Sequence, residues 1–119
     1  MDRDHPRLAS QADSFHPAVL RLIANTVKAA HAHGKWVGVC GAMASEKLAV
    51  PLLLGLGVDE LSVSVPLIPA IKAAVREVDL LDCQAIAQQM LGLESAEQVR
   101  EALRQHHEAT VDTSLVLEN

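Results

Sequence analysis

The sequence predicts an α/β fold in which helices alternate with the strands of a parallel sheet. Two short runs with the alternation of strands, residues 34–41 and 60–64, are each followed by a segment whose apolar residues have helical spacing. A third helical pattern precedes the first run. This order is typical of a parallel sheet with right-handed crossovers. The 119 residues, of which 50% are hydrophobic, suffice for a domain with its own core.

The first helix is predicted over residues 17–33. Pro17 suits its first turn, and Gly34 stands where a residue just past a helix end is expected. Inside this range apolar side chains recur on one helix face, namely Val19, Leu22, Ile23, Val27 and Ala30. The first strand follows directly, over residues 34–41.

The first strand delivers Cys40, between Gly38 and Gly41, to the point where the next helix is expected to begin. Alternation places Trp36, Gly38 and Cys40 on one face of the strand, and Val37 and Val39 on the other. A free cysteine usually packs as a small hydrophobe. Glycines around it, however, let a substrate approach the backbone closely. Core packing and a role as acid, base or nucleophile therefore both remain open for Cys40.

The remaining elements follow in order. The helix after Cys40 must start late, because Pro51 is tolerated only in a first turn, and it stops at Gly55 or Gly57. Residues 60–64 form the second strand, and the later helices are predicted over residues 68–78, 79–91 and 95–107, the last with a capping box between Ser95 and Gln98. Residues 110–119 are expected to fray.

Composition excludes several classes of protein. A net charge of -5 with one Trp, one Phe and no Tyr argues against nucleic-acid binding. The longest apolar stretch, residues 48–58, is shorter than the roughly 20 residues of a membrane span, so no membrane insertion is expected. Two cysteines without a CxxC motif fit a reducing, cytoplasmic location, and Cys83 is assigned to packing. The six histidines lack metal-ligand spacing and are expected on the surface, so no metal site is predicted.

Three segments carry a resemblance to a known family: residues 38–41 (Gly-Val-Cys-Gly), 52–64 and 68–72. Together they resemble the last part of the phosphoenolpyruvate-binding domain of enzyme I of the bacterial sugar phosphotransferase system. The resemblance runs from Asp2 to about Leu103. The sequence around residues 15–17 and 63–66 is especially similar to that of the multiphosphoryl transfer proteins. In these proteins enzyme I is fused to a phosphocarrier domain and a fructose-specific IIA domain.

The resemblance implies a phosphoenolpyruvate-binding (β/α)8 TIM barrel, of which this chain would supply the last two βα units and the C-terminal helices. Residues 1–108 would be the C-terminal part of that domain and residues 109–119 a flexible tail. Such barrels place their sites at the C-terminal ends of the strands, where Cys40 would lie. The barrel's magnesium ligands would lie upstream of Met1.

The resemblance also implies roles for two residues. Cys40 would protonate carbon 3 of enolpyruvate to give pyruvate, which suits a thiol because an ordinary cysteine, with a pKa of about 8.5, is protonated at neutral pH. Arg3 would contact the phosphoryl group through its fixed charge and forked donors. The phosphoryl group would pass from phosphoenolpyruvate to a protein histidine and on to a phosphocarrier protein. The isolated chain is expected to be inactive.

Two departures from the family pattern bear on activity. Ala42 stands where the family usually has a glutamate two residues after the cysteine, and Ser45-Glu46 stands where it usually has Gly-Asp. Two alternative interpretations stay open. One is the C-terminal part of a pyruvate phosphate dikinase or phosphoenolpyruvate synthase, and the other is a non-catalytic dimerisation module with a buried Cys40. Because two parallel strands cannot close a barrel, the chain is expected to form a homodimer.

Overall fold

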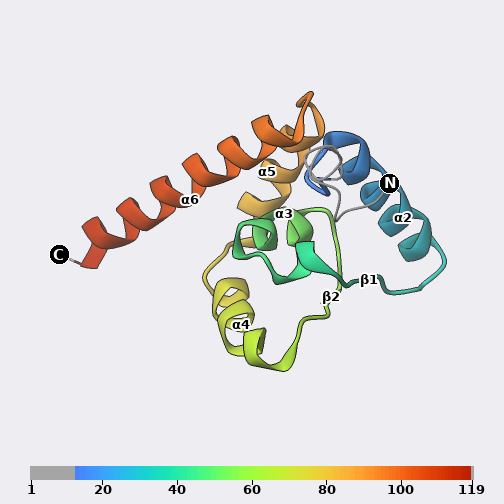
Figure 1. Ribbon diagram of the computed structural model, residues 1–119, viewed down its shortest axis with the longest axis horizontal. Helices are drawn as coiled ribbons and strands as arrows, with labels where there is room; N and C mark the ends of the chain where they lie inside the picture. The colour runs from blue at the N-terminus through green and yellow to red at the C-terminus, as the bar shows by residue number, and fades with distance from the viewer. Residues whose placement is uncertain (1–12, 119) are drawn as a thin grey trace, which may run out of the picture.

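The structure is a computed structural model. It describes the backbone of residues 13–118 and the side chains of residues 13–111. Helices pack on one side of a small two-stranded parallel sheet (Figure 1). The elements in chain order are α2 (Pro17–Ala32), β1 (Gly38–Val39), η1 (Ala42–Ser45), η2 (Lys47–Ala49), α3 (Val50–Gly55), β2 (Glu60–Leu61), η3 (Val65–Leu67), α4 (Ile68–Arg76), α5 (Leu80–Leu91) and α6 (Ala96–Glu118).

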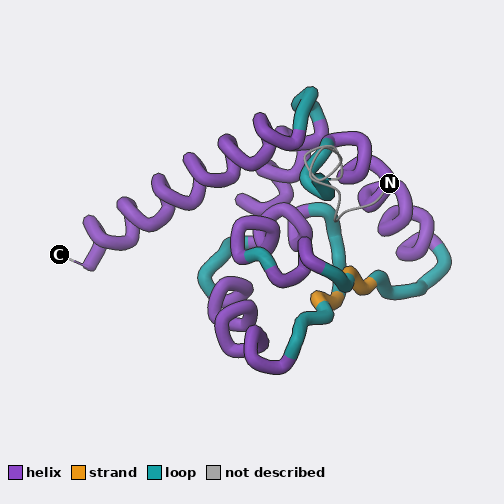
Figure 2. Tube along the Cα trace, viewed as in Figure 1, coloured by secondary structure: helices purple, strands orange, loops and turns teal. Residues whose placement is uncertain are grey.

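The two strands pair in parallel, as the order of the elements predicts. Gly38 pairs with Glu60 and Val39 with Leu61, and the Ser62 N–H donates to the Val39 carbonyl at 2.9 Å. Both strands are much shorter than the predicted runs (Figure 2). Backbone geometry explains where β1 stops, because Gly41 has a φ of +94°, which is incompatible with an extended strand.

The predicted helices are present, with two corrections. Leu22, expected on the apolar face of α2, is 66% exposed. The helix after Cys40 does start late: the 3-10 turns η1 and η2 come first, and Pro51 lies in the first turn of α3. The expected end of the last helix at residue 107 is wrong, because α6 continues to Glu118 and its distal part extends away from the body (Figure 1). Residues 108–118 contain neither glycine nor proline, so nothing in the sequence ends the helix earlier.

Side-chain caps fix the starts of the last two helices. The Asp79 carboxylate accepts the Asp82 N–H at 3.1 Å before α5. Before α6, the Ser95 Oγ accepts the Gln98 N–H at 3.1 Å, which is the first half of the predicted capping box. The Gln98 side chain returns one residue earlier than that motif requires, and accepts the Glu94 N–H at 2.9 Å.

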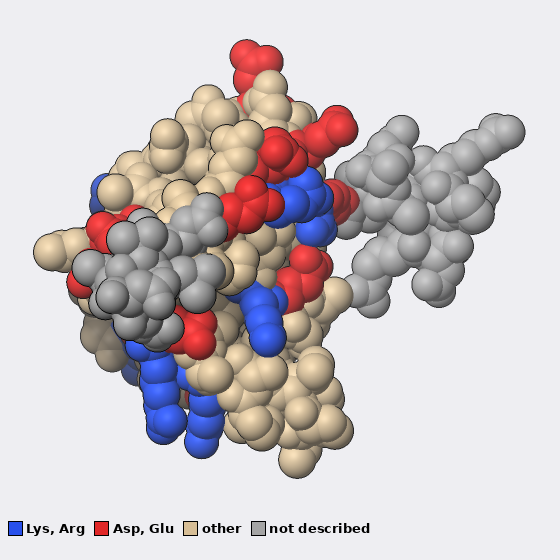
Figure 3. Space-filling view, turned by 90° about the vertical axis from the view of Figure 1, so that its left-hand side faces the viewer, with Lys and Arg blue, Asp and Glu red and all other residues tan. Residues whose placement is uncertain are grey.

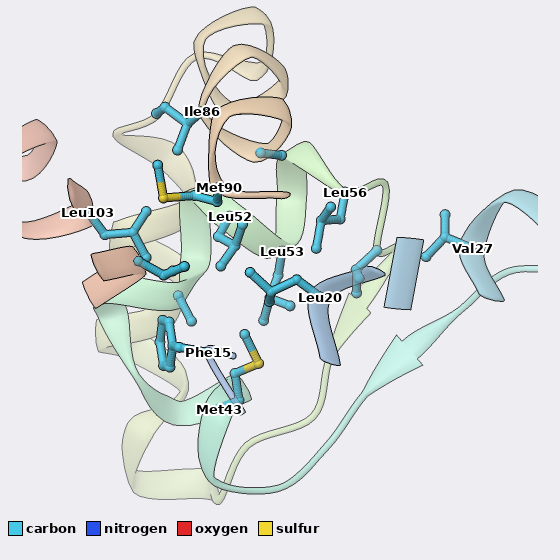
Figure 4. Close-up of a cluster of buried hydrophobic side chains, with 14 residues drawn as sticks. Phe15, Leu20, Val27, Met43, Leu52, Leu53, Leu56, Ile86, Met90 and Leu103 are labelled. Carbon is cyan, nitrogen blue, oxygen red and sulfur yellow. The ribbon is translucent and has the colours of Figure 1, made fainter. Parts of the chain in front are cut away.

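The hydrophobic core lies between the helices and one face of the sheet. Phe15, before α2, and Met43 of η1 converge with Ile86 and Met90 of α5 in one cluster (Figure 4). Helix α3 is buried along most of its length and packs on α5. Other buried members of the cluster are Leu20, Val27, Ala49, Leu52, Leu53, Leu56, Val58, Ala87, Val99 and Leu103.

The two faces of the sheet differ in their surroundings, as the alternation predicts. Val37, Val39 and Leu61 pack against the core. The opposite face carries Trp36, whose exposed fraction is 68%, and the exposed residues Gly38, Cys40, Glu60, Ser62 and Ser64. We call these six residues the open face of the sheet. In the described part of the chain no helix covers them, which leaves Cys40 accessible.

Candidate active site at the end of strand β1

Cys40 is a free, exposed thiol that directly follows β1. The interpretation in which it packs in the core is therefore wrong for this structure, and Cys83 is the buried cysteine, with an exposed fraction of 1%. Burial raises the pKa of the Cys83 thiol, with smaller contributions from the charges of Asp82 and Asp79. The two thiols thus occupy opposite environments.

The backbone turns sharply immediately after Cys40. Gly41 adopts a φ of +94° and a ψ of -170°, a conformation that residues with a side chain rarely adopt. The segment that follows is the four-residue turn η1, where an α-helix was expected to begin, so no helix dipole of useful length points at the thiol. Met43 and Ala44 of η1 are buried and hold this turn against the core.

The other residues of the open face add polar and aromatic groups to the side of the sheet that carries Cys40. The Ser62 hydroxyl donates to the Glu60 carboxylate at 3.1 Å. A Cβ atom at Gly38 would lie 3.2 Å from the Trp36 ring, so the indole lies over the backbone of β1. If the ladder register is extended by one residue, Cys40 stands opposite Ser62. The neighbouring strand carries the Glu60 carboxylate, which stands opposite Gly38 in the ladder, whereas Ala42 supplies no carboxylate.

Arg100 of α6 joins the loop after Cys40 to the N-terminal segment. Its Nε and Nη2 donate to the two carboxylate oxygens of Asp13 at 2.7 and 2.9 Å, and its Nη1 donates to the Glu46 carboxylate at 3.1 Å. The guanidinium carbon lies 4.1 Å from the centroid of the Phe15 ring. The hydrogen bonds from Arg100 lower the pKa of Asp13, and the bonds to Asp13 and Glu46 raise that of Arg100.

The Arg100 cluster was missed by sequence reasoning. Asp13 and Arg100 are 87 residues apart, and no periodic pattern or motif connects them. On the face shown in Figure 3, acidic and basic side chains lie beside one another, so a single charged residue gives little indication of its partner.

A second link ties α2 to the residues that directly precede β1 and β2. The Asp59 carboxylate contacts His31 Nε2 at 2.8 Å and accepts the Val37 N–H at 2.9 Å. These two bonds, that of His31 first, lower the pKa of Asp59. His31 lies at the surface as expected, with an exposed side-chain fraction of 43%, but it has a specific partner that its spacing did not reveal.

Several predicted features cannot be placed at this site. Arg3 lies outside the described residues. Within residues 13–111, no group of three or more His, Cys, Asp or Glu side chains could hold a metal ion. A hollow of about 290 Å³ lies between β2 and α4, lined by residues including Leu61, Ile71 and Lys72, and Cys40 does not contribute to it. None of the described helices is long and apolar enough to cross a membrane.

The comparisons with known proteins define the class of this chain. Residues 1–80 match the family model of the PEP-utilising enzymes, PEP-binding domain. Cys40 and the whole open face of the sheet lie within the matched residues. The chain belongs to this family, and the resemblance that the sequence carries is confirmed.

Three relatives indicate which members of this family the chain resembles. The chain is 51% identical over 100 residues to a multiphosphoryl transfer protein of Xanthomonas campestris pv. campestris, covering 84% of this chain and 12% of that protein. It is 41% identical over 120 residues to multiphosphoryl transfer protein 1 of Escherichia coli K12, covering 100% and 14%. It is 39% identical over 103 residues to a phosphoenolpyruvate-protein phosphotransferase of Priestia megaterium, covering 87% and 18%. The chain thus spans less than a fifth of the length of each of these relatives.

Proposed function

We propose that this chain contributes the proton donor of a phosphoenolpyruvate-protein phosphotransferase of the sugar phosphotransferase system. The observation that carries the proposal is the position of Cys40, which is exposed directly after β1 on the open face of the sheet. The names of the relatives support it, as does the match of residues 1–80 to the PEP-binding domain. We further propose that the longer protein to which this chain belongs is cytoplasmic and of the multiphosphoryl transfer type.

The proposed chemistry has two steps. The phosphoryl group leaves the enol oxygen of phosphoenolpyruvate for a histidine nitrogen of the protein, and the electron pair of the broken bond stays on the enolate of pyruvate. Carbon 3 of the enolate then takes the proton of the Cys40 thiol, which gives pyruvate and a thiolate. The thiolate recovers a proton from solvent, to which the exposed Cys40 has access. A phosphocarrier protein would receive the phosphoryl group from the histidine.

Two further parts of the proposal concern groups outside the described residues. Arg3 would bind the phosphoryl group, because a guanidinium offers parallel donors to phosphate oxygens. Magnesium would neutralise charge on the substrate, as is general in phosphoryl transfer. The described residues hold no cluster that fits a metal ion, so its ligands are proposed elsewhere in a longer protein, and no step is derived through it.

We also propose that β1 and β2 are the last two strands of a (β/α)8 barrel. Their parallel pairing supports this, since a barrel of this type is built from parallel strands. The difference between the faces supports it too: one face packs on the helical core, and the open face would line the barrel interior. Cys40 would then stand at the C-terminal end of its strand, where barrel enzymes carry their reactive groups.

A chimera tests the proposed function. The matching segment of multiphosphoryl transfer protein 1 of Escherichia coli K12, which covers 100% of this chain, is replaced by the whole chain, and phosphoenolpyruvate-dependent phosphorylation of a phosphocarrier protein is measured. The unmodified chimera should be active, and Cys40→Ser should lower kcat by roughly 100-fold or more, the scale of general acid catalysis. Cys83→Ala is the matched control and should stay within a few-fold. Full activity of folded Cys40→Ser would refute the proposal.

The chain by itself should transfer no phosphoryl group and should associate with a second copy. The open face, with Trp36 at its edge, leaves apolar and backbone surface to be covered, and a two-fold dimer is the commonest arrangement. In sedimentation at micromolar concentration the chain should run heavier than its 12.7 kDa. Its Trp36 emission should shift to the blue as concentration rises. A monomer with solvent-exposed Trp36 would exclude association through this face.

A further inference from the structure

The loop that follows Cys40 is held at two places. Met43 and Ala44 of η1 are buried against the core, and Glu46 accepts a hydrogen bond from Arg100 Nη1 at 3.1 Å. Among the side-chain hydrogen bonds of the described residues, this is the one that reaches residues 41–49. The contact comes from α6, which is 54 residues further along the chain.

Glu46 connects η1 to η2, and the local sequence does not determine how these two turns are oriented. It lies between η1 and η2, with an extended backbone at φ -93° and ψ 120°. Both neighbours are 3-10 turns of only three or four residues, and such turns have little stability of their own. The orientation of η1 therefore depends on contacts made from outside the loop, and Arg100 supplies a charged one.

Arg100 can hold Glu46 in place because its own side chain is fixed by several contacts. Asp13 binds it through two parallel hydrogen bonds of 2.7 and 2.9 Å, and its guanidinium stacks over the Phe15 ring. Phe15 itself is fully buried. Only about a quarter of the Arg100 side chain is exposed, with a fraction of 28%. The donor that reaches Glu46 is thus fixed by the core.

The position of Cys40 depends on the same loop. Its side chain is exposed, so packing does not hold it, and strand pairing ends one residue earlier at Val39. On the other side only Gly41 separates it from η1. A shift of η1 would therefore move the thiol, and displacements of about 1 Å can cost 100-fold in rate when a reacting group must be positioned.

We propose that Arg100 is a positioning residue for Cys40: through Glu46 it fixes η1, and η1 sets where the thiol stands relative to the substrate. This inference rests on the proposed function of Cys40. It assigns Arg100 no contact with substrate. It predicts that removing the guanidinium slows proton donation while leaving substrate binding intact.

The test uses the active chimera and the variants Arg100→Met and Arg104→Met. Arg104 is the matched control, because it lies one turn further along α6, is 55% exposed, and among the described residues forms its ion pair with Glu101, away from the loop after Cys40. Arg100→Met should lower kcat about 10-fold with less than a 2-fold change in KM for phosphoenolpyruvate. The solvent deuterium isotope effect on kcat should rise, because proton donation becomes rate-limiting. Arg104→Met should change neither quantity.

Further variants separate positioning from simple stabilisation. Glu46→Gln keeps the shape of the side chain and weakens the contact, so it should lower kcat in the same direction by about 3-fold. Its effect should not add to that of Arg100→Met in a double-mutant cycle. If Arg100→Met fails to fold, Glu46→Gln carries the test, since the Glu46 side chain is 38% exposed and the substitution is mild.

The possible failures are distinguishable. Activity lost only in proportion to folded protein, with an unchanged isotope effect, would reduce Arg100 to a structural role and overturn the inference. Additive effects of the two substitutions would overturn the route through Glu46. If Cys40→Ser abolishes activity while folded Arg100→Met retains full kcat, only this inference fails. If Cys40→Ser is fully active, the proposed function fails and the inference fails with it.

Discussion

The surroundings of Cys83 and Cys40 show how differently two cysteines of one small chain can be constrained. Around Cys83, α3 and α5 approach so closely that a Cβ atom at Gly55 would lie 2.0 Å from the Cys83 carbonyl oxygen. Around Cys40, the open face exposes Trp36 and Ser62, and a Cβ atom at Gly38 would meet the Trp36 ring at 3.2 Å and Glu60 at an ordinary 3.6 Å. The region around Cys83 is fixed by a close approach of two backbone segments. The region around Cys40 is restricted mainly by one exposed side chain, that of Trp36.

The difference between these regions separates stability from reactivity. The contact between α3 and α5 excludes solvent and leaves no room for adjustment, so its residues determine whether the chain folds. The open face contributes little buried area, and its residues are free to serve a substrate or a partner. Substitutions that are chemically identical should therefore have very different effects in the two regions.

The largest effect is expected for Gly55→Ala. In an ordinary helix this change stabilises by about 0.5–1 kcal/mol, because alanine has less backbone entropy to lose. Here the new methyl group would overlap the Cys83 carbonyl and press on Ala87, whose Cβ would be 2.9 Å away. Overpacking usually costs about 1–3 kcal/mol, and a clash with backbone belongs at or above the upper end. The free energy of unfolding, measured in urea, should fall by about 3 kcal/mol or more.

Gly92→Ala provides the control for Gly55→Ala. Gly92 follows α5, and a Cβ atom there would meet its nearest neighbour, the Gln89 carbonyl oxygen, at an ordinary 3.5 Å. This variant should unfold within about 1 kcal/mol of the unmodified chain. Equal stability of the Gly55→Ala variant and the unmodified chain would show that α3 and α5 can separate without cost.

The next largest effect concerns the reactivity of the two thiols. In the folded chain, diluted below the concentration at which it associates, iodoacetamide should modify Cys40 at least about 100-fold faster than Cys83. Cys83 is 1% exposed and burial raises its pKa, so it reacts only when the structure opens. A 100-fold ratio corresponds to about 2.8 kcal/mol at 1.4 kcal/mol per tenfold.

Peptide mapping by mass spectrometry measures both rates in one sample. In urea above the unfolding midpoint the two rates should converge, because both thiols are then in solvent. Comparable rates in the folded chain would contradict the buried position of Cys83, and would remove the contrast between the two regions.

A smaller effect is expected from the ion pair between Asp13 and Arg100. The Arg100 hydrogen bonds hold the pKa of Asp13 below its ordinary value of 3.8. A carboxyl group whose pKa is lower in the folded state adds stability above its unfolded pKa, and this is lost as pH falls through the folded value. Asp13→Asn should therefore lower the free energy of unfolding by about 1 kcal/mol at pH 7, after allowance for partial exposure.

The pH dependence identifies the cause of that loss. Because the Asn side chain does not titrate, the difference between Asp13→Asn and the unmodified chain should shrink steadily below about pH 4. Urea unfolding at pH 7, 5 and 3 measures it. A difference that stayed constant across this range would show that packing, and not the charge of Asp13, accounts for the effect.

The sequence predicted those features that depend on local pattern. Alternation placed Val39 toward the core and Cys40 on the opposite face, and the backbone chemistry of Pro51 required α3 to start late. The assignment of Cys83 to packing is confirmed in the same way. Each of these expectations rests on neighbours within one element.

The features that the sequence did not reveal are pairs formed between distant segments. His31 and Asp59 are 28 residues apart, and Asp13 and Arg100 are 87 apart, so neither pair leaves a periodic signal. The extension of α6 beyond residue 107 was missed for another reason. Residues 108–118 contain neither glycine nor proline, so no residue there stops a helix.

The smallest effect is expected for Gly38→Ala, the counterpart of Gly55→Ala on the open face. In a strand, alanine gains about 0.5–1 kcal/mol over glycine through the entropy of the unfolded chain. The methyl group would press on the Trp36 ring at 3.2 Å, but that side chain is 68% exposed and free to move aside. The two terms nearly cancel, so the free energy of unfolding should change by less than about 0.5 kcal/mol. Trp36 fluorescence should change at the same time, since the indole must shift. A loss of more than 2 kcal/mol would show that the ring is held in place, and that the open face is as tightly constrained as the contact at Cys83.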